Sequence, residues 1–378
     1  MAAAVFSSRK DDMKTSQFWY PLPARLIAQH PAERRGTEKM LVLHRDTGVV
    51  EHRHIADIAD YITANDLLVV NDTKVFPARL IGTWADTPGE VEVLMVAAAP
   101  MDGSDMPSVA EDSLDRLEWN CILGSGRKCR EGQIAVFGPD RELKARLVKP
   151  LQGIGMWRVE FICDRPLAAL LDEFGHTPVP PYVKREGTAE EERADRERYQ
   201  TIYAKHTGSV AAPTAGLHFT PEIFAALDAK GVKRVAVTLH VGPGTFRPVK
   251  AENIEDHHMD FEAFTVPPET ADAINACKAR GGRVFCVGST TVRTLETVAA
   301  STPDGRVVAG SGASDIFIYP PYEFKVCDAM LTNFHLPQST LVMMVSALAG
   351  RERILCSYAL AVQKEYKFFS YGDCMLIV

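Results

Sequence analysis

From about residue 175 onward, short apolar strands alternate with helices that carry start and stop signals, and this alternation constrains the fold more than any other feature of the chain. Thr220 and Pro221 supply an N-cap and a first-turn proline to an apolar-periodic run that Gly231 ends. Strands that alternate with helices predict an α/β domain. The further elements expected here are strands over 234–241, 283–287, 316–319 and 329–333 and helices over 268–280, 291–300, 339–348 and 351–366.

The beginning of the chain adds strands of the same kind. Residues 41–45 and 49–54 are expected to form paired strands, because Asp46-Thr47-Gly48 between them is a hairpin turn signal. A short apolar strand over 67–71 follows. These strands are expected to join the α/β layer of the later part of the chain.

The stretch between these two parts has a different pattern. From 75 to about 161 the chain is glycine-rich and contains short alternating segments, which is typical of a small all-β module. The sequence therefore predicts a discontinuous α/β domain with a β-rich insertion. The expected limits are 16–74 and 175–378 for the α/β domain, 75–174 for the insertion, 97–115 for a mobile loop within it, and 1–15 for a flexible extension.

Composition excludes several classes of protein. Hydrophobic residues make up 46% of the chain and charged residues 24%, as in ordinary soluble globular proteins. No apolar run reaches the roughly 18 residues that a membrane helix needs, and the N-terminal residues lack the apolar core of a secretory signal. The eight cysteines form no CxxC pair. This usage favours a reducing cytoplasm, with thiols as small core residues rather than zinc ligands or disulfides.

The net charge of −7 is unevenly distributed. Residues 84–118 hold nine acids and one base, so this stretch carries −8 and the remainder of the chain +1. Residues 121–150 hold seven bases and three acids. This basic segment is either a surface for a phosphate backbone or a solvated strand face.

Common nucleotide-binding and hydrolase motifs are absent from the sequence. It contains no P-loop, GxSxG elbow, HExxH motif or GxGxxG loop after a strand. The histidine pairs His52/His54 and His257/His258 each lack a third ligand at a recognised spacing, so we expect no metal site.

Four polar segments are expected at the ends of strands, where open α/β sheets bind ligands. They cover 71–74, 211–219, 240–247 and 288–293. The last is a strand–turn–helix start whose free N–H groups and hydroxyls suit a carboxylate or phosphate. The alternative is that Ser289 or Thr290 is only a helix cap, and that Thr214 and His218 only satisfy a buried turn. Four such segments in one domain favour a shared cleft.

These segments belong to longer motifs, which are NDTKVFPARL (71–80), GSVAAPTAGLHFT (208–220), TLHVGPGTFRPV (238–249), IEDHHM (254–259), VGSTTVRTLE (287–296), DIFIYP (315–320), LTNFHLPQSTLVMMVSALAG (331–350) and FFSYGD (368–373). Through these motifs the chain resembles, from about Phe18 to its C terminus, the S-adenosylmethionine:tRNA ribosyltransferase-isomerase family of queuosine biosynthesis. The resemblance implies a mixed α/β main domain with an inserted β-barrel-like domain.

The resemblance also implies a reaction and its partners. The ribosyl part of S-adenosylmethionine is transferred to 7-aminomethyl-7-deazaguanine at the wobble position of a tRNA and isomerised, which gives epoxyqueuosine and releases adenine and methionine. S-adenosylmethionine is then a substrate, so no cofactor is expected. The expected protein is a cytoplasmic monomer.

Such a reaction needs a base to remove a proton acidified by the sulfonium, and an acid assists the departure of adenine. The resemblance makes His218 and His240 the first candidates and His335 the third, because histidine titrates near neutral pH. Asp72 and Glu296 are carboxylate alternatives. The assignment of acid and base stays open, and the amine of the substrate is another possible base.

The remaining polar residues of the motifs are expected to bind substrate. Those of segment 289–293 suit the methionine carboxylate or a tRNA phosphate, Arg79 and Arg247 suit phosphate, and Asn333 has the donor and acceptor pattern to read a purine edge. The expected substrate-binding residues are Asn71, Thr73, Arg79, Thr214, Phe219, Gly242, Gly244, Thr245, Arg247, Ser289, Thr290, Thr291, Arg293 and Asn333.

The chain also departs from the usual family pattern. The usual Arg-Asp-x-Ser-Arg is here Arg35-Gly36-Thr37-Glu38-Lys39, and Asp260 replaces the second histidine of the EDHxMH segment. Two alternative functions compete with the ribosyl-transfer enzyme: a non-catalytic RNA-binding protein of the same fold, and another nucleoside-processing enzyme such as a phosphorylase. Adenine release that needs tRNA but not phosphate would discriminate among the three.

Overall fold

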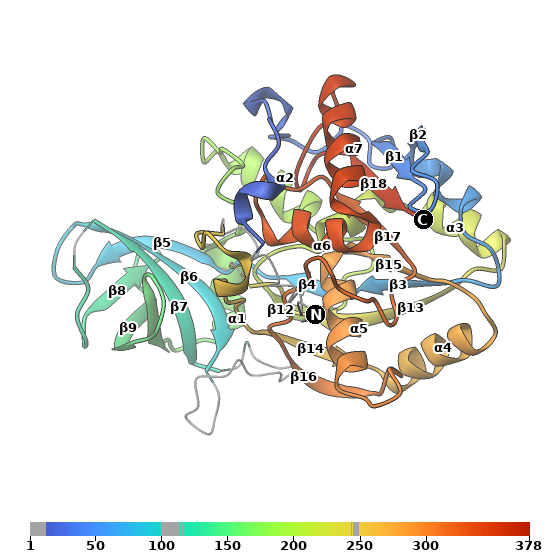
Figure 1. Ribbon diagram of the computed structural model, residues 1–378. Helices are drawn as coiled ribbons and strands as arrows, with labels where there is room; N and C mark the ends of the chain where they lie inside the picture. The colour runs from blue at the N-terminus through green and yellow to red at the C-terminus, as the bar shows by residue number, and fades with distance from the viewer. Residues whose placement is uncertain (1–12, 100–113, 115, 127, 243, 245–248) are drawn as a thin grey trace, which may run out of the picture.

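The computed structural model describes residues 13–99, 114, 116–126, 128–242, 244 and 249–378. Two structural units are apparent (Figure 1): a large layered α/β unit and a smaller β-barrel beside it. The predicted class, a mixed α/β fold with an inserted barrel-like domain, is confirmed. The predicted extension 1–15 and loop 97–115 lie mostly outside the described residues.

A nine-stranded sheet forms the centre of the α/β unit. Its order is β16-β14-β13-β3-β15-β17-β18-β1-β2, and β13, β3, β15 and β17 are mutually parallel. The carboxyl ends of these four strands therefore lie at one edge of the sheet. The strands are β1 (Lys39–Leu43), β2 (Val50–His54), β3 (Leu67–Asn71), β13 (Lys233–Leu239), β14 (Glu262–Val266), β15 (Val284–Val287), β16 (Gly310–Ser314), β17 (Ala329–Asn333) and β18 (Cys374–Ile377).

Both faces of this sheet are buried, which explains why its central strands are continuous apolar runs. Leu67 and Val69 of β3 pack on one face, and Leu68 and Val70 pack on the other. The first face is covered by α4 (Pro268–Ala279), α5 (Gly288–Ala300), α6 (Thr340–Ala349) and α7 (Arg351–Gln363), and the second by α3 (Pro221–Ala229).

The second unit is a closed antiparallel barrel of six strands. The strand order β5-β6-β7-β10-β9-β8 closes because β8 pairs back with β5. Alternate residues such as Val91, Val93 and Met95 fill the interior. The strands are β5 (Arg79–Trp84), β6 (Glu90–Ala98), β7 (Glu118–Ser125), β8 (Ile134–Phe137), β9 (Leu143–Pro150) and β10 (Met156–Ile162).

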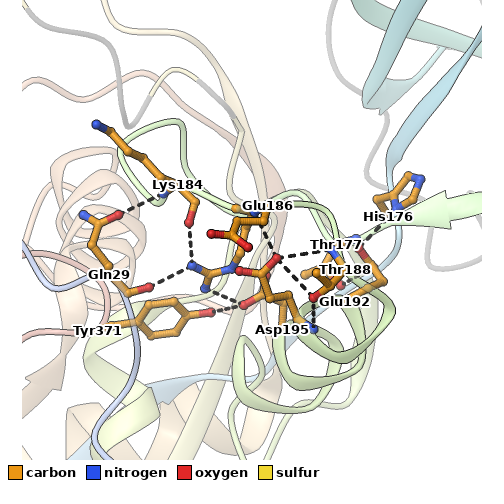
Figure 2. Close-up of polar contacts among 11 residues, drawn as sticks. Gln29, His176, Thr177, Lys184, Glu186, Thr188, Glu192, Asp195 and Tyr371 are labelled. Atoms are coloured by element: carbon orange, nitrogen blue, oxygen red, sulfur yellow. Dashed lines mark hydrogen bonds and ion pairs between the residues drawn. The ribbon is translucent and has the colours of Figure 1, made fainter.

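A short helix, α2 (Ala189–Arg198), connects the barrel to the C-terminal part of the α/β unit (Figure 2). Its Glu192 accepts from the backbone of Thr177 at 2.9 Å, next to β11 (Gly175–His176), which pairs with β5. One turn later, Asp195 accepts from the Tyr371 hydroxyl at 3.2 Å. Asp195 also accepts from Nε and Nη2 of the Arg185 guanidinium, both at 2.7 Å. Two carboxylates one turn apart on α2, those of Glu192 and Asp195, are therefore tied to different units. The helix α1 (Leu167–Phe174) and the two-stranded pair of β4 (Thr73–Val75) and β12 (His206–Ser209) complete the junction.

Some sequence expectations about the elements are wrong. No strand forms over 316–319; the edge strand is β16, five residues earlier in the chain. The apolar side chains of 316–319 pack against the core without a backbone partner, whereas the glycine- and serine-rich β16 is held by pairing with β14. The helix expected at 291 begins three residues earlier, at Gly288. Among the described residues, no helix is long and apolar enough to cross a membrane.

Closure of the barrel depends on Gly82 of β5. A Cβ at this position would lie 2.2 Å from the Val136 carbonyl oxygen of β8. We expect Gly82→Ala to lower the free energy of unfolding by about 1–3 kcal/mol, because the strands must move apart. Gly126→Ala is the control, since a Cβ there meets nothing within 4 Å. Urea denaturation measures both, and equal stabilities of the two variants would contradict the steric explanation.

Candidate active site

A cavity lies at the carboxyl ends of β15 and β17, and we call it the strand-end cavity. Its walls come from segments that are distant in the sequence, and five of the quoted motifs contribute residues to them. Ligand binding at this edge is the general behaviour of open α/β sheets. The lining residues are Tyr182, Ala212, Pro213, Thr214, Ala215, Val241, Gly288, Ser289, Thr290, Thr332, Asn333, Phe334, His335, Leu336, Ser339, Leu341, Phe369 and Ser370.

The side chain of Asn333, at the end of β17, connects three of these segments. Its Oδ1 accepts from the Thr214 hydroxyl at 3.1 Å. Its Nδ2 donates to the Phe369 carbonyl oxygen and to Nε2 of His218, both at 3.1 Å. The carbonyl of Phe369 can only accept, which fixes the orientation of the amide. Both amide hydrogens are thus engaged, and Asn333 can offer a ligand only its Oδ1.

This amide also fixes the tautomer of His218. Because Nε2 accepts from Asn333, the proton of a neutral ring lies on Nδ1. Nδ1 has no hydrogen-bond partner among the described residues; it faces Oε1 of Glu38 at 3.8 Å, beyond hydrogen-bond distance. His218 is 2% exposed and lines a separate small pocket with Glu38 rather than the strand-end cavity.

Glu38 is a site residue that sequence reasoning missed. Its Oε2 accepts from the backbone N–H of Gly36 at 2.8 Å. Burial alone would raise the pKa of Glu38, but the interactions with His218 and with backbone N–H groups outweigh burial and hold that pKa below its ordinary value. The carboxylate therefore stays charged beside the imidazole. The only sequence signal was the departure of residues 35–39 from the family pattern.

His335 is the histidine that lines the strand-end cavity. Its Nε2 lies 2.8 Å from the Thr332 hydroxyl, and its backbone N–H donates to the Tyr358 hydroxyl at 3.3 Å. Burial lowers the pKa of His335 to about 3, because the imidazolium would lose its hydration. The ring is accordingly neutral at pH 7.

The other predicted histidine, His240, lies in a separate cluster. Its Nδ1 is 2.8 Å from the Thr73 hydroxyl, and its ring packs on Gly208, where a Cβ would be only 2.8 Å away. Burial and the neighbouring His206 lower its pKa to about 4. Asp72 accepts from the Thr238 hydroxyl at 2.6 Å in the same cluster, and burial raises the pKa of Asp72. None of these residues lines the strand-end cavity. The four polar segments therefore do not all meet in one cleft, as the sequence had suggested.

Two predicted phosphate ligands line a larger interdomain cleft between the barrel and the α/β unit. Arg79 of β5 pairs with Glu92 at 2.8 Å, and the buried Arg293 of α5 pairs with Glu262. Predicted Gly244 lines the same cleft. The cleft is lined by Arg79, Glu92, Leu94, Ile122, Ile154, Pro178, Val179, Pro180, Pro181, Val183, Arg185, Val210, Gly244, Lys250, Ala251, Asp256, His257, His258, Met259, Asp260, Glu262, Arg293 and Thr340.

Several other predicted residues make contacts within the fold and line neither the cavity nor the cleft. The Glu296 carboxylate accepts from the backbone N–H groups of residues 325–327 at 2.9–3.0 Å and so fastens this segment to α5. Phe219 stacks on Phe224 with ring centroids 5.0 Å apart. The Thr291 hydroxyl donates to the Val287 carbonyl.

Two further predicted residues form hydrogen bonds within the fold, and two others lie outside the described residues. Asn71 bonds to both backbone groups of Leu239. Gly242 donates its N–H to Glu262 at 2.9 Å. Thr245 and Arg247 lie outside the described residues. In the described part of the chain, no group of three or more histidine, cysteine or acidic side chains could hold a metal ion.

Comparison with known proteins places the chain in a family. The family model for "Queuosine biosynthesis protein" matches residues 15–377. The chain is 48% identical over 367 residues to the S-adenosylmethionine:tRNA ribosyltransferase-isomerase of Moorella thermoacetica, covering 97% of this chain and 100% of that protein. It is 46% identical over 366 residues to the protein of the same name from Caldanaerobacter subterraneus subsp. tengcongensis, with the same coverage.

A crystal structure of the S-adenosylmethionine tRNA ribosyltransferase from Thermotoga maritima is also similar. It is 34% identical, with a TM-score of 0.51, and the match covers 96% of this chain and 100% of that one. The chain belongs to the queuosine biosynthesis protein family. The resemblance predicted from the motifs is thereby confirmed.

The buried state of His335 generates a prediction about pH. As the pH falls through 6.5, His335 takes a proton in the unfolded chain but stays neutral in the folded chain until about pH 3. Protons in this window therefore favour unfolding. Between pH 7 and pH 5 the protein should lose about 2 kcal/mol more stability than the His335→Gln variant. Urea denaturation at both pH values measures the difference, and identical losses would show that the fold does not lower the pKa of His335.

Proposed function

We propose that this protein transfers the ribosyl part of S-adenosylmethionine to a tRNA and isomerises it, and that the strand-end cavity holds S-adenosylmethionine during the reaction. The acceptor is 7-aminomethyl-7-deazaguanine at the wobble position, and adenine and methionine are released. The full-length similarity to relatives of that name supports the reaction. The observation that carries the location is the connection of Thr214, Asn333 and His218 beside a cavity built from family motifs.

The cavity suits a sulfonium compound. All of its lining residues are uncharged, given the neutral His335. The rings of Tyr182 and Phe369 line it as a pair, with centroids 4.4 Å apart and planes inclined by 30°. Aromatic faces attract a desolvated cation. The sulfonium of S-adenosylmethionine is such a cation, and its charge acidifies the adjacent ribose protons.

His335 is the side chain placed to exchange a proton with a ligand in the cavity. Its imidazole is neutral and can take up a proton acidified by the sulfonium, which is one of the two tasks that the reaction sets, although its lowered pKa makes it a weaker base than a free histidine. His218 reaches the cavity only through Asn333, so we assign His218 and Glu38 to holding the Asn333 amide in place. The amine of the substrate remains the alternative base.

The tRNA must approach the cavity from outside, and the interdomain cleft supplies basic side chains for it. Arg79, Arg185 and Lys250 all line this cleft. Arginine and lysine contacts to phosphates supply most of the sequence-independent affinity for nucleic acid. The proposal includes the remaining sequence expectations: an α/β domain at 16–74 and 175–378 with its insertion at 75–174, a cytoplasmic monomer, and no cofactor.

The test is release of adenine from S-adenosylmethionine, measured by chromatography with tRNA that carries the deazaguanine base. Wild type should release adenine only with this tRNA, without added phosphate and after exhaustive chelation of metals. His335→Gln should lower turnover by roughly 100-fold or more, as expected for loss of a general base. His218→Gln should retain more activity than His335→Gln, because His218 acts through Asn333.

His30→Gln is the matched control, because His30 is exposed and lines neither the strand-end cavity nor the small pocket of His218 and Glu38. It should keep wild-type turnover, and the affinity of every variant for tRNA should change little. Adenine release that requires phosphate would instead indicate a phosphorylase. Binding of tRNA without any release would indicate a non-catalytic RNA-binding protein. Full activity of His335→Gln would remove this residue from the reaction.

A further inference from the structure

The N terminus of helix α5 opens into the strand-end cavity without a side-chain cap. The helix begins at Gly288 directly after β15, and the preceding Val287 has no side chain that could accept a hydrogen bond. Gly288 has φ of +83°, which lets the chain turn from strand to helix in one residue. Gly288, Ser289 and Thr290 all line the cavity. A helix start of this kind presents N–H groups and a partial positive charge to a ligand.

The hydroxyl of Thr290 is an independent indication of a ligand here. Thr290 is 5% exposed, and its Oγ1 has no hydrogen-bond partner among the described residues. The next hydroxyls along the helix are satisfied: Thr291 donates to the Val287 carbonyl and Thr294 to the Thr290 carbonyl. An unpaired buried hydroxyl is costly, and such groups in native proteins usually have a reason. An acceptor bound in the cavity supplies that reason.

A second helix start at the same cavity shows the contrast. Helix α6 is capped by Ser339, whose hydroxyl accepts from the backbone N–H of Val342 at 3.3 Å. Its first turn thus already has an acceptor, whereas the first turn of α5 has none from a side chain. Of the two helix starts, only that of α5 has first-turn N–H groups without a side-chain acceptor, and these groups can donate to an anion.

The charge of the cavity limits which anion fits. No lysine, arginine, aspartate or glutamate lines it, and Arg293, one turn further along α5, is already paired with Glu262. A lone phosphate would therefore be buried without a counter-charge, which is unfavourable. An α-amino acid group brings its own ammonium beside its carboxylate, so an uncharged cavity can accept it.

We propose that the N terminus of α5 binds the methionyl carboxylate of S-adenosylmethionine, with the Thr290 hydroxyl and the N–H groups of the first turn as donors. This proposal rests on the proposed function, which makes S-adenosylmethionine the substrate. It places the amino acid end of the substrate at α5, with Tyr182 and Phe369 lining the same cavity for the sulfonium. Thr290 is then a substrate-binding residue and not a helix cap.

Decarboxylated S-adenosylmethionine, which keeps the sulfonium and adenosine but lacks the carboxylate, tests this site. Equilibrium binding of both compounds is measured by calorimetry for wild type and variants. Wild type should bind S-adenosylmethionine at least about tenfold more tightly, as expected for hydrogen bonds to a charged group. Thr290→Val should lower the affinity for S-adenosylmethionine by about tenfold and leave the affinity for the decarboxylated compound unchanged. Thr290→Ser, which keeps the hydroxyl, should recover most of the preference.

Thr297→Val is the matched control, because it removes a hydroxyl from the same helix where Thr297 contacts Ser314 rather than the cavity. Its preference for S-adenosylmethionine over the decarboxylated compound should equal that of wild type. Equal binding of both compounds by wild type would overturn the carboxylate site, and so would an equal loss for both compounds in Thr290→Val. The proposed function fails separately: a protein that prefers S-adenosylmethionine but never releases adenine supports the carboxylate site and contradicts the reaction.

Discussion

The parallel pairing of β13, β3, β15 and β17 is the constraint on which the site depends. It aligns the carboxyl ends of these strands at one sheet edge, where the chain leaves each strand and exposes polar groups. Packing on both faces keeps this register fixed, because a slip of one residue would move every side chain to the opposite face and disrupt the close packing of both cores. The cavity at β15 and β17 is thus a consequence of how the core is packed.

The Asn333 amide holds the segments around that edge together. It accepts from Thr214 and donates to Phe369 and His218, so two segments that lie over 100 and over 30 residues away along the chain meet at one side chain. Buried amides of this kind are stabilising only when all partners are present, because an unpaired polar group in a low-dielectric interior is costly. Loss of one partner would therefore be expected to disturb the others, including the tautomer of His218.

Local sequence patterns were sufficient for much of the fold. β3 and β17 have the limits that their apolar runs predicted, and α3 lies between its threonine cap and its glycine stop. β16 could not be predicted, because a Gly-Ser-Gly-Ala-Ser strand has little intrinsic preference and forms through its pairing with β14. The local sequence of one strand does not reveal which other strand pairs with it.

The site was less predictable because its contacts are long-range. Sequence reasoning brought His218, Asn333, Thr214, Ser289 and Thr290 to one edge, and the structure places them in or directly behind one cavity. It did not reveal that His240 packs on Gly208 of β12 and bonds to Thr73 of β4 instead of lining that cavity, since this close packing depends on the missing Cβ of Gly208. Nor did it reveal Glu38, which meets His218 across 180 residues of sequence with no local motif. These parts of the site follow from packing between distant segments.

The central claim is that S-adenosylmethionine occupies the strand-end cavity, and a crystal structure with S-adenosylmethionine or an unreactive analogue bound tests it most directly. We expect density in the cavity, with the carboxylate at the first turn of α5 within hydrogen-bond distance of Thr290 and the sulfonium beside Tyr182 and Phe369. A ligand bound in the interdomain cleft with the strand-end cavity empty would contradict this claim.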